Sequence, residues 1–436
     1  MQIANILSDD GVAATGLLTE ATQAFEQHES NVRSYCRTFP AVFQRAEGSF
    51  MYDEEGRRFT DLFCGAGALN YGHNHPRLRQ ALLDYISGNG ITHSLDMYTE
   101  AKRDFILDFQ STILEPRQLV YRQMFCGPTG TNAVEAAMKL ARKVTGRPRI
   151  AAFTNGFHGM SLGALAATGS RSKRSAAGIP LSNVDRYPFD GFLGKDVDTI
   201  EYIQKLIENP SSGFDIPAAF LLETIQAEGG INIASSQWLN KLTKLAQKHG
   251  ILVIIDDIQM GCGRTGKFFS FEEANLYPDI VCLSKSLSGY GLPMSLVLIK
   301  PEWDQWNPGE HNGTFRGHNL AFVTARAILK EWQDTKAVQR IQENGRLLHD
   351  WLTNLPELGR GRLKTRGRGL VAGIEFASGA QAQRVVQSAF EQQVVVETCG
   401  PQSQVVKLLP AINAQAQELG HALAVISRAI ARECQA

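Results

Sequence analysis

Short, nearly continuous apolar runs recur through the middle of the chain and alternate with longer segments of helical periodicity. Strands that are covered on both faces have this composition, and successive parallel strands are usually joined by a helix. The pattern therefore predicts an α/β fold whose active-site loops lie at the carboxyl ends of mostly parallel strands. The expected strands are Gln123–Cys126, Ile150–Phe153, Ala219–Leu222, Leu252–Ile255, Ile280–Leu283 and Leu296–Ile299.

The two ends of the chain have a different pattern. Residues 50–59 alternate like a hairpin with a polar turn, and further strands are expected at Leu370–Phe376 and Val394–Val396. A chain of 436 residues is long enough for two domains. The predicted units are an N-terminal arm at 1–22, a small α+β domain formed by 23–70 and 331–436, and a large domain at 71–330.

Charge and cysteine content exclude several classes of protein. Lys+Arg and Asp+Glu are both 44, so no basic field is available to attract nucleic acid. The seven cysteines are scattered and form no Cys-x-x-Cys pair, which is typical of a reduced cytosolic protein. The N-terminus lacks the layout of a signal peptide, and no apolar run approaches the length of a membrane span. We expect a cytoplasmic enzyme.

One helix between the expected strands has clear start and stop signals. Ser236 is expected to cap it and Gly250 to end it, just before the strand that leads to Asp256. Its apolar face consists of Trp238, Leu239, Leu242, Leu245 and Ala246.

Lys285 and Asp256 each follow the end of an apolar run. If both runs are parallel strands, the two side chains lie at the same edge of the sheet. A lysine can form a Schiff base with the aldehyde of pyridoxal phosphate, and an aspartate can hold a proton on its pyridine nitrogen. A single lysine is usually a solvated surface residue, but the order of motifs along this chain favours the cofactor site.

A possible phosphate site lies between Phe125 and Glu135. A strand is followed there by a Gly/Pro turn and by a helix expected at about Thr131–Lys143. The free N–H groups and the positive dipole end of a helix suit a phosphate, and Gly130 permits close approach. Taken alone, the motif is more often an ordinary capped helix, because Gly-rich helix starts are common.

Two further motifs are ambiguous by themselves. Phe157 lies in a Gly-rich loop, where it could stack on a flat heterocycle or pack in the core. Asp256 and Asp257 could suggest a metal site, but neighbouring strand residues point to opposite faces. His73 and His75 have no Cys/His/Asp cluster that would complete a zinc site, so we expect no bound metal.

Together these motifs resemble the class III (ω-amino acid) aminotransferases, which belong to the fold-type I enzymes that use pyridoxal 5'-phosphate. The similarity runs over roughly residues 40–410 and is carried by Gly72–Pro76, Gly130–Ala133, Phe157–Gly159, Glu223–Gly230, Asp256–Gln259 and Lys285. A closer resemblance is to the diaminobutyrate–2-oxoglutarate aminotransferases, including the type that opens ectoine biosynthesis. It is carried by Gly65–Gly72, Thr92–Met97, Gly127–Glu135, Ser288–Met294 and Gly309–Gly317.

The resemblance implies a role for each matching residue. Lys285 would be the Schiff-base lysine and the proton shuttle, and Asp256 would pair with the pyridine nitrogen. Gln259 would reach the phenolic oxygen, and Phe157 would stack on the ring. His158 and Glu223 stand in matching motifs and are expected among the cofactor-binding residues.

Other implied roles concern the phosphate and the substrates. Gly130 and Thr131 would hold the phosphate, joined by Thr314 from the partner subunit of a homodimer or higher homo-oligomer. Glu228 would be the acid that pairs with an arginine in one half-reaction and releases it in the other.

The sequence departs from the family at two positions that usually read substrate carboxylates. Met160 stands where many relatives have an arginine, and Lys407 stands where many have an arginine before the late proline motif. We expect Lys407 and Arg316 to supply the missing positive charge. Lysine is a point charge without a bidentate fork, so the geometry must differ.

The activity implied by the resemblance is transamination between L-glutamate and L-aspartate 4-semialdehyde, which gives L-2,4-diaminobutyrate and 2-oxoglutarate. A related ω-aminotransferase acting on ornithine, 4-aminobutyrate or another terminal amine is the alternative. A fold that has lost catalysis and serves as a scaffold is a third possibility, but the intact Lys285 and Asp256 argue against it.

Overall fold

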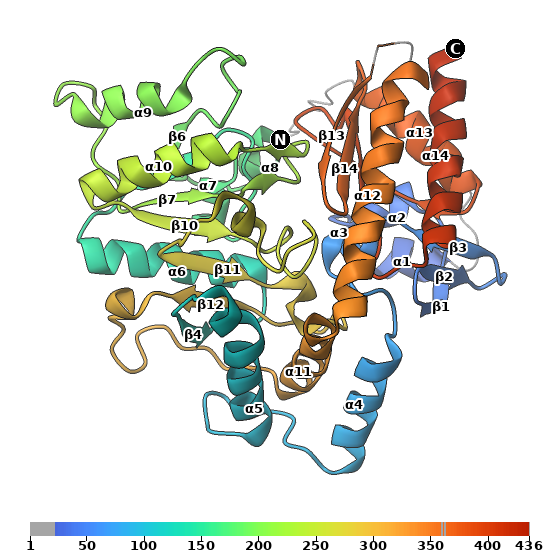
Figure 1. Cartoon of the computed structure of the whole chain (residues 1–436), viewed down its shortest axis with the longest axis horizontal. Coiled ribbons are helices and arrows are strands. Elements are labelled where there is room, and N and C mark those ends of the chain that lie inside the picture. The colour runs from blue at the N-terminus through green and yellow to red at the C-terminus, as the bar shows by residue number, and fades with distance from the viewer. Residues whose placement is uncertain (1–21, 359–360, 362, 436) are drawn as a thin grey trace, which may run out of the picture.

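The computed structural model describes residues 22–358, 361 and 363–435. Two groups of elements lie side by side (Figure 1). One contains a seven-stranded sheet formed by the middle of the chain, and the other contains the long helices near the C-terminus together with the N-terminal strands. The predicted arm at 1–22 falls almost entirely outside the described residues.

The predicted central strands are confirmed, and their edges differ by a residue at most. The sheet order is β4-β12-β11-β10-β7-β5-β6. Alternate strand residues enter two separate apolar cores, so both faces are covered and the runs are continuously apolar. The strands are β4 (Arg122–Phe125), β5 (Ile150–Phe153), β6 (Val184–Tyr187), β7 (Ala219–Leu222), β10 (Leu252–Asp256), β11 (Ile280–Leu283) and β12 (Leu296–Ile299).

The sheet is mostly parallel, as predicted, and β12 is the exception. It pairs antiparallel with both β11 and β4. The segment between β11 and β12 holds only the short 3₁₀ turn η5 (Lys285–Ser288), and no crossover helix returns the chain to the start of the sheet. An antiparallel neighbour needs no such helix. The edge strand β6 was not predicted, because Asp185 and Arg186 interrupt its apolar pattern.

The helix before β10 is α10 (Ser236–His249), and the prediction that Ser236 caps it was wrong. The cap is Ser235, whose side chain accepts a hydrogen bond from the N–H of Trp238. That spacing matches an N-cap oxygen and the third helical N–H, and Ser236 is already helical. Gly250 ends the helix in the left-handed conformation with φ of 59°, as predicted.

Helices cover both faces of the central sheet. The phosphate-turn helix α6 runs over Gly130–Thr145, somewhat longer than predicted. The remaining helices of the large group are α4 (Pro76–Ser87), α5 (Glu100–Phe109), α7 (Leu162–Ala167), α8 (Arg171–Ser175), α9 (Thr199–Glu208) and α11 (Asn319–Gln333). Within the part of the chain that the structure describes, no helix is both long and apolar enough to span a membrane.

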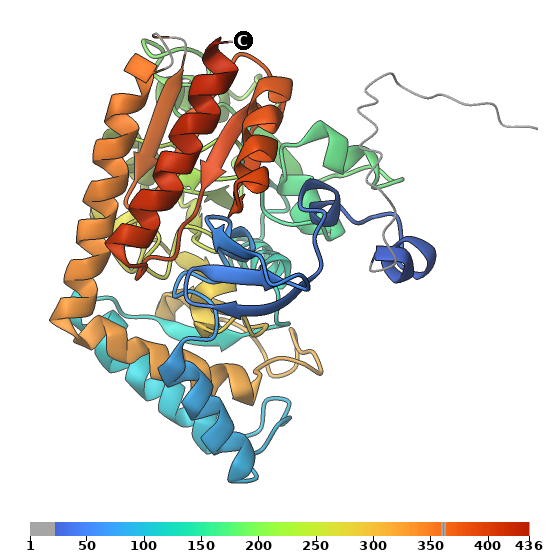
Figure 2. The same cartoon turned by 90° about the vertical axis from the view of Figure 1, so that its right-hand side faces the viewer.

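The two ends of the chain meet in the second group of elements. The predicted hairpin is present as β2 and β3, and β15 adds to β3 in parallel, which joins N-terminal and C-terminal segments in one sheet. Figure 2 shows these N-terminal strands beside α14. The strands are β1 (Phe43–Glu47), β2 (Phe50–Asp53), β3 (Arg58–Asp61), β13 (Lys364–Arg368), β14 (Val371–Glu375), β15 (Val394–Val395), β16 (Glu397–Cys399) and β17 (Val405–Leu408).

Helices complete this second group, and α12, α13 and α14 share its apolar core with the N-terminal strands. The helices of this group are α1 (Gln23–His28), α2 (Tyr35–Thr38), α3 (Cys64–Gly67), α12 (Thr335–Leu358), α13 (Gly379–Glu391) and α14 (Ala416–Gln435). The domain boundaries near 71 and 331 stay a prediction.

A buried guanidinium joins the two groups. Arg264 lies in the loop that follows β10 and is fully buried. Its Nη1 donates to the carbonyl oxygens of Leu370, at 2.9 Å, and Pro410, at 2.5 Å. Its Nη2 donates to Oδ1 of Asn70 at 2.6 Å. One side chain therefore ties the β10 loop to both the N-terminal and the C-terminal parts of the chain.

Replacing Arg264 tests this connection. Arg264→Gln should lower the free energy of unfolding by about 3 kcal/mol or more, because it leaves buried acceptors without donors. Arg103→Gln removes an exposed arginine on α5 and should cost no more than about 0.5 kcal/mol. Denaturant unfolding of both variants, loaded alike with cofactor, gives the comparison. Equal midpoints would contradict a structural role for Arg264.

Candidate active site

The lysine and the aspartate predicted to form the site follow adjacent parallel strands. Asp256 is the last residue of β10, and its register partner on β11 is Cys282, three residues before Lys285. Lys285 opens η5 with φ of 42°, in the left-handed region. Strained backbone of this kind is concentrated at functional sites. The sequence-based prediction that these residues share one edge of the sheet is confirmed in the fold.

A histidine holds the Asp256 carboxylate. His158 Nδ1 lies 2.8 Å from Asp256 Oδ2, and both side chains are buried. The N–H of Ile258 donates to the other carboxylate oxygen at 3.2 Å. Burial lowers the pKa of His158, but the hydrogen bond and charge of Asp256 outweigh it and raise that pKa above the ordinary value. The pair fixes the orientation of a negative charge at the strand end.

Glu223 braces the loop that carries Phe157. The N–H of Phe157 donates to Glu223 Oε2 at 3.0 Å, and the N–H of Ala227 donates to Oε1 at 3.3 Å. Burial raises the pKa of Glu223 to about 8, and the nearby Asp256 charge adds to this effect. The Phe157 ring has the ammonium of Lys173 4.6 Å from its centroid.

The expected phosphate turn is formed as the start of α6. Thr129 caps the helix by accepting from the N–H of Asn132, which leaves the first N–H groups at Gly130 and Thr131 without helical partners. Thr131 Oγ1 lies 2.7 Å from Ser161 Oγ. A Cβ at Gly159 would lie 2.3 Å from Thr131 Oγ1, so only glycine permits this approach. Ser161 was missed by the sequence reasoning, because the two segments meet only in the fold.

A buried lysine lies between two carboxylates near Lys285. Lys407 Nζ is 2.5 Å from Glu228 Oε1 and 3.0 Å from Glu397 Oε1. Gln259 Nε2 also approaches Glu228 Oε1, at 3.4 Å, and donates to the carbonyl of Ala66 at 2.7 Å. The acid that the resemblance pairs with an arginine is therefore paired with a lysine in this chain.

Two residues of this cluster were missed. Glu397 is an acid inside an apolar run, which was the available signal, but its partner depends on strand register. The ring of Tyr35 lies 5.0 Å from that of Phe63. The side chain of Tyr35 is half-exposed, and partial burial, followed by the charges of Glu397 and Glu228, raises its pKa to about 12. No pattern around Tyr35 distinguishes it in the sequence.

The environment of Lys285 makes its amine easier to deprotonate. Burial is the main cause that lowers its pKa, to about 8, and the positive charge of Lys407 contributes. The Glu228 carboxylate opposes the shift. The side chain of Lys285 forms no hydrogen bond or ion pair with another residue in the described part of the chain. Since its pKa is about 8, part of this amine is neutral near neutral pH, and the neutral form is a nucleophile and a base.

Not every predicted residue joins the cluster. The carbonyl of Thr314 lies 2.8 Å from His93 Nε2, and Arg316 Nη1 lies 3.7 Å from Asp96 Oδ2. Neither residue contacts Lys285 or Lys407 within the described chain. Met160 is exposed.

The alternative metal motifs form other contacts. Asp257 accepts from the N–H of Ser270 on the far side of the strand from Asp256, and burial raises its pKa to about 7. His73 pairs with Asp61 at 2.8 Å. No cluster of three or more metal-binding side chains occurs within the described residues.

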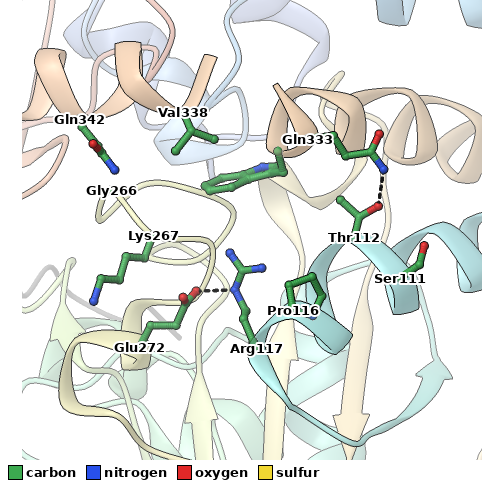
Figure 3. A pocket seen from close by; sticks show the side chains of 11 residues that line it. Ser111, Thr112, Pro116, Arg117, Gly266, Lys267, Glu272, Gln333, Val338 and Gln342 are labelled. Carbon is green, nitrogen blue, oxygen red and sulfur yellow. Dashed lines mark hydrogen bonds and ion pairs between the residues drawn. The ribbon is translucent and has the colours of Figure 1, made fainter. Parts of the chain in front are cut away.

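An open cavity of about 580 Å³ lies elsewhere, where α11 and α12 meet the turn after α5 (Figure 3). Its charged groups have partners: Arg117 Nε donates to Glu272 at 2.9 Å, and Lys267 Nζ lies 3.3 Å from Glu273 Oε2. The indole of Trp332 also lines this cavity. None of the residues around Lys285 borders it.

The site fits pyridoxal phosphate on an observation independent of sequence motifs. Gln259 Oε1 is buried and has no hydrogen-bond partner in the described chain, which is the condition of a group that a bound molecule completes. Around it lie an amine, a fixed carboxylate, an aromatic ring and a helix N-terminus. The fold and this set of groups define an enzyme that uses pyridoxal phosphate.

Comparison with known proteins gives the family. The model of the class III aminotransferase family matches residues 32–430. The chain belongs to this family, whose cofactor is pyridoxal phosphate.

Individual relatives agree with this assignment. An uncharacterised aminotransferase, y4qG, of Sinorhizobium fredii is 54% identical over 94% of this chain and 92% of its own length. A diaminobutyrate–2-oxoglutarate transaminase of Streptomyces avermitilis is 55% identical over 93% of this chain and 97% of its own.

Solved structures are similar in fold. An ornithine aminotransferase of Toxoplasma gondii has a TM-score of 0.80 at 24% identity, covering 96% of both chains. An S-selective transaminase of Arthrobacter sp. has a TM-score of 0.84 at 20% identity, covering 94% of this chain and 97% of its own. At these identities the likeness concerns the fold alone.

The lowered pKa of Lys285 predicts its chemical reactivity. In cofactor-free protein, trinitrobenzenesulfonate should label Lys285 increasingly as the pH rises through about 8, because the neutral amine is the reactive form. Mass spectrometry of labelled peptides over a pH series around this value measures the midpoint. Lys244, exposed on α10, is the comparison site within the same protein. Labelling of Lys285 that does not precede that of Lys244 would refute the shift.

Proposed function

We propose that the enzyme transfers an amino group between L-glutamate and L-aspartate 4-semialdehyde, giving L-2,4-diaminobutyrate and 2-oxoglutarate in a reversible reaction. The observation that carries the substrate assignment is the naming of its relatives. Proteins from Streptomyces, Halalkalibacterium, Nocardia and Bordetella are named diaminobutyrate–2-oxoglutarate transaminases and are 51–55% identical over 93–96% of this chain.

The chemistry divides between cofactor and protein. When bound, pyridoxal phosphate supplies an aldehyde that carries the amino group and a ring that accepts electrons as a substrate C–H bond breaks. Lys285 is the residue placed to take that proton and return it, because its amine is neutral in part at the working pH. The same residue serves in both half-reactions, since each one moves a proton at the reacting carbon.

The other residues of the site would orient and hold the cofactor. Asp256, fixed by His158, keeps a negative charge where a protonated ring nitrogen would lie. Phe157 offers a ring face, and the free N–H groups at Gly130 and Thr131 suit the phosphate. Gln259 and Glu223 complete the wall of the cofactor site.

Substrate carboxylates need positive charge, and Met160 offers none. Lys407 is the buried cation near Lys285, and in this structure it is paired with Glu228. We propose that Lys407 binds a carboxylate of glutamate when Glu228 is displaced. Arg316 is the second candidate. Because it does not reach this cluster within one chain, it would act across a subunit interface, as would Thr314.

A homodimer or larger homo-oligomer agrees with the surface of the protein. Exposed apolar side chains gather on α4, α5 and the loop between them. The members of this surface are Leu83, Ile86, Ile91, Leu95, Met97, Tyr98 and Leu107. Exposed apolar side chains that gather in one segment of the chain are typical of a protein–protein interface. The scattered cysteines favour a cytoplasmic location for the assembly.

A substrate panel tests the reaction. Purified protein loaded with pyridoxal phosphate is given 2-oxoglutarate with L-2,4-diaminobutyrate, L-ornithine, 4-aminobutyrate or N-acetylornithine, and glutamate formation is followed. We expect diaminobutyrate to be preferred by at least about tenfold in kcat/KM, or about 1.4 kcal/mol of transition-state binding. A preference for another amine would keep the reaction class and refute the substrate. Lys285→Ala is the inactive control.

The interface has its own test. Met97→Glu combined with Tyr98→Glu should lower the mass in solution toward the 48.0 kDa of one chain, because burying two added charges opposes association. Cofactor retention should fall with it if Thr314 acts across the interface. Light scattering and cofactor absorbance give the two readings. Tyr202→Glu, on exposed α9, is the control, and equal behaviour of both proteins would argue against this surface.

A further inference from the structure

Glu397 and Lys407 form a cross-strand pair. They lie on β16 and β17 and are direct register partners in antiparallel strands. Glu397 Oε1 lies 3.0 Å from Lys407 Nζ as an ion pair, yet this oxygen has no partner with hydrogen-bond geometry in the described chain. The Lys407 side chain is 0% exposed and that of Glu397 is 6% exposed. The pairing of β16 with β17 therefore fixes the positions of both residues.

Glu228 holds the same ammonium from a different direction. It follows the short strand β8 (Ile225–Gln226), in the turn before β9 (Asn232–Ile233). Its side chain is 23% exposed, in contrast to the 6% of Glu397. Of the two carboxylates, that of Glu228 is the more accessible from outside the cluster. A solute that approaches Lys407 therefore competes with Glu228 and not with Glu397.

Two carboxylates around one ammonium give the cluster an excess of negative charge. Lys407 lowers the pKa of Glu228 to about 2 despite burial, whereas burial keeps the pKa of Glu397 above its ordinary value. The two acids raise the pKa of Lys407 against its burial. The other titratable groups that act on the cluster are Lys285, Lys173, Tyr35 and Cys399.

We propose that Glu397 is a positioning residue that stays paired with Lys407 while Glu228 gives way to the carboxylate of glutamate. This inference rests on the proposed use of glutamate as amino donor. It does not depend on which amine is the second substrate.

The physical reason is the cost of a buried charge without a partner. An ammonium is a compact point charge on a flexible stem and lacks the fork that fixes a guanidinium. During the exchange Lys407 has neither Glu228 nor substrate beside it, and an unpaired buried ammonium would lose its proton or move. Glu397 keeps it protonated and directed at the site. The amine half-reaction brings no carboxylate to this position, so it does not need Glu397.

The test compares Glu397→Gln with Glu391→Gln, which removes an exposed acid at the end of α13. The first readout is binding of glutarate, a dicarboxylate without an amino group, by calorimetry across a pH series. Loss of the Glu397 charge lowers the pKa of Lys407, so the alkaline limit of glutarate binding should move to lower pH. A shift of about one pH unit corresponds to about tenfold weaker binding on that limb.

The second readout is the pH profile of kcat/KM in each half-reaction. For Glu397→Gln with glutamate as substrate, the alkaline limb of the kcat/KM profile should move to lower pH. With the preferred amine as substrate, kcat/KM should stay within about twofold of the unmodified enzyme. Glu391→Gln should match the unmodified enzyme in both. Glu397→Asp retains the charge and should restore part of the glutamate profile, which also covers the case that the glutamine variant folds poorly.

Three outcomes would overturn the inference. Glutarate binding in Glu397→Gln could keep its pH dependence, both half-reactions could change alike, or Glu397→Asp could behave no better than the glutamine variant. Unmodified enzyme that turns over glutamate but not diaminobutyrate would refute the proposed substrate alone. Unmodified enzyme that neither binds glutarate nor uses glutamate would refute the proposed function and this inference together, before any variant is made.

Discussion

The buried guanidinium of Arg264 is the contact on which the geometry of the site depends. Arg264 lies in the loop after β10, the strand that ends in Asp256. Its guanidinium donates hydrogen bonds to the carbonyl of Pro410 and to the side-chain amide oxygen of Asn70. Pro410 lies three residues after Lys407, so this contact places β17 relative to the central sheet. A charge of this kind is stable in the interior only with its donors engaged. Both ends of the chain are consequently held against the loops that carry the chemistry.

The charges of two clusters then act on Lys285. In one, the His158–Asp256 pair fixes a carboxylate at the end of β10. In the other, Lys407 lies between Glu228 and Glu397. Lys285 itself is paired with neither cluster, and burial keeps its pKa near 8. The structure thus separates the charge that would tune the cofactor ring from the charges that would sort substrates, and leaves the amine able to move protons.

The sequence was sufficient for the parts that depend on local pattern and insufficient for those that depend on pairing. Runs such as Ile280–Leu283 are covered on both faces, so their composition predicted strands almost to the residue. The same composition hid the direction of β12, since an antiparallel strand buried on both faces is equally apolar. Lys285 and Asp256 could be predicted because each follows a legible strand. Glu397 could not, because its meaning depends on register with Lys407.

Lys407 stands where many relatives have an arginine, and its two acidic neighbours, Glu228 and Glu397, explain how a lysine can serve there. A guanidinium would meet a carboxylate with two parallel hydrogen bonds in a fixed geometry. A single ammonium gives less directional binding, and here it lies between two acids with the strand partner Glu397 on one side. With Glu228 in place the cluster is electronegative and would accommodate an arriving amine. In the proposed exchange, displacing Glu228 would leave one cation and one anion, so a carboxylate would be held weakly enough to leave again. An enzyme that must accept both kinds of substrate at one position is served by this balance.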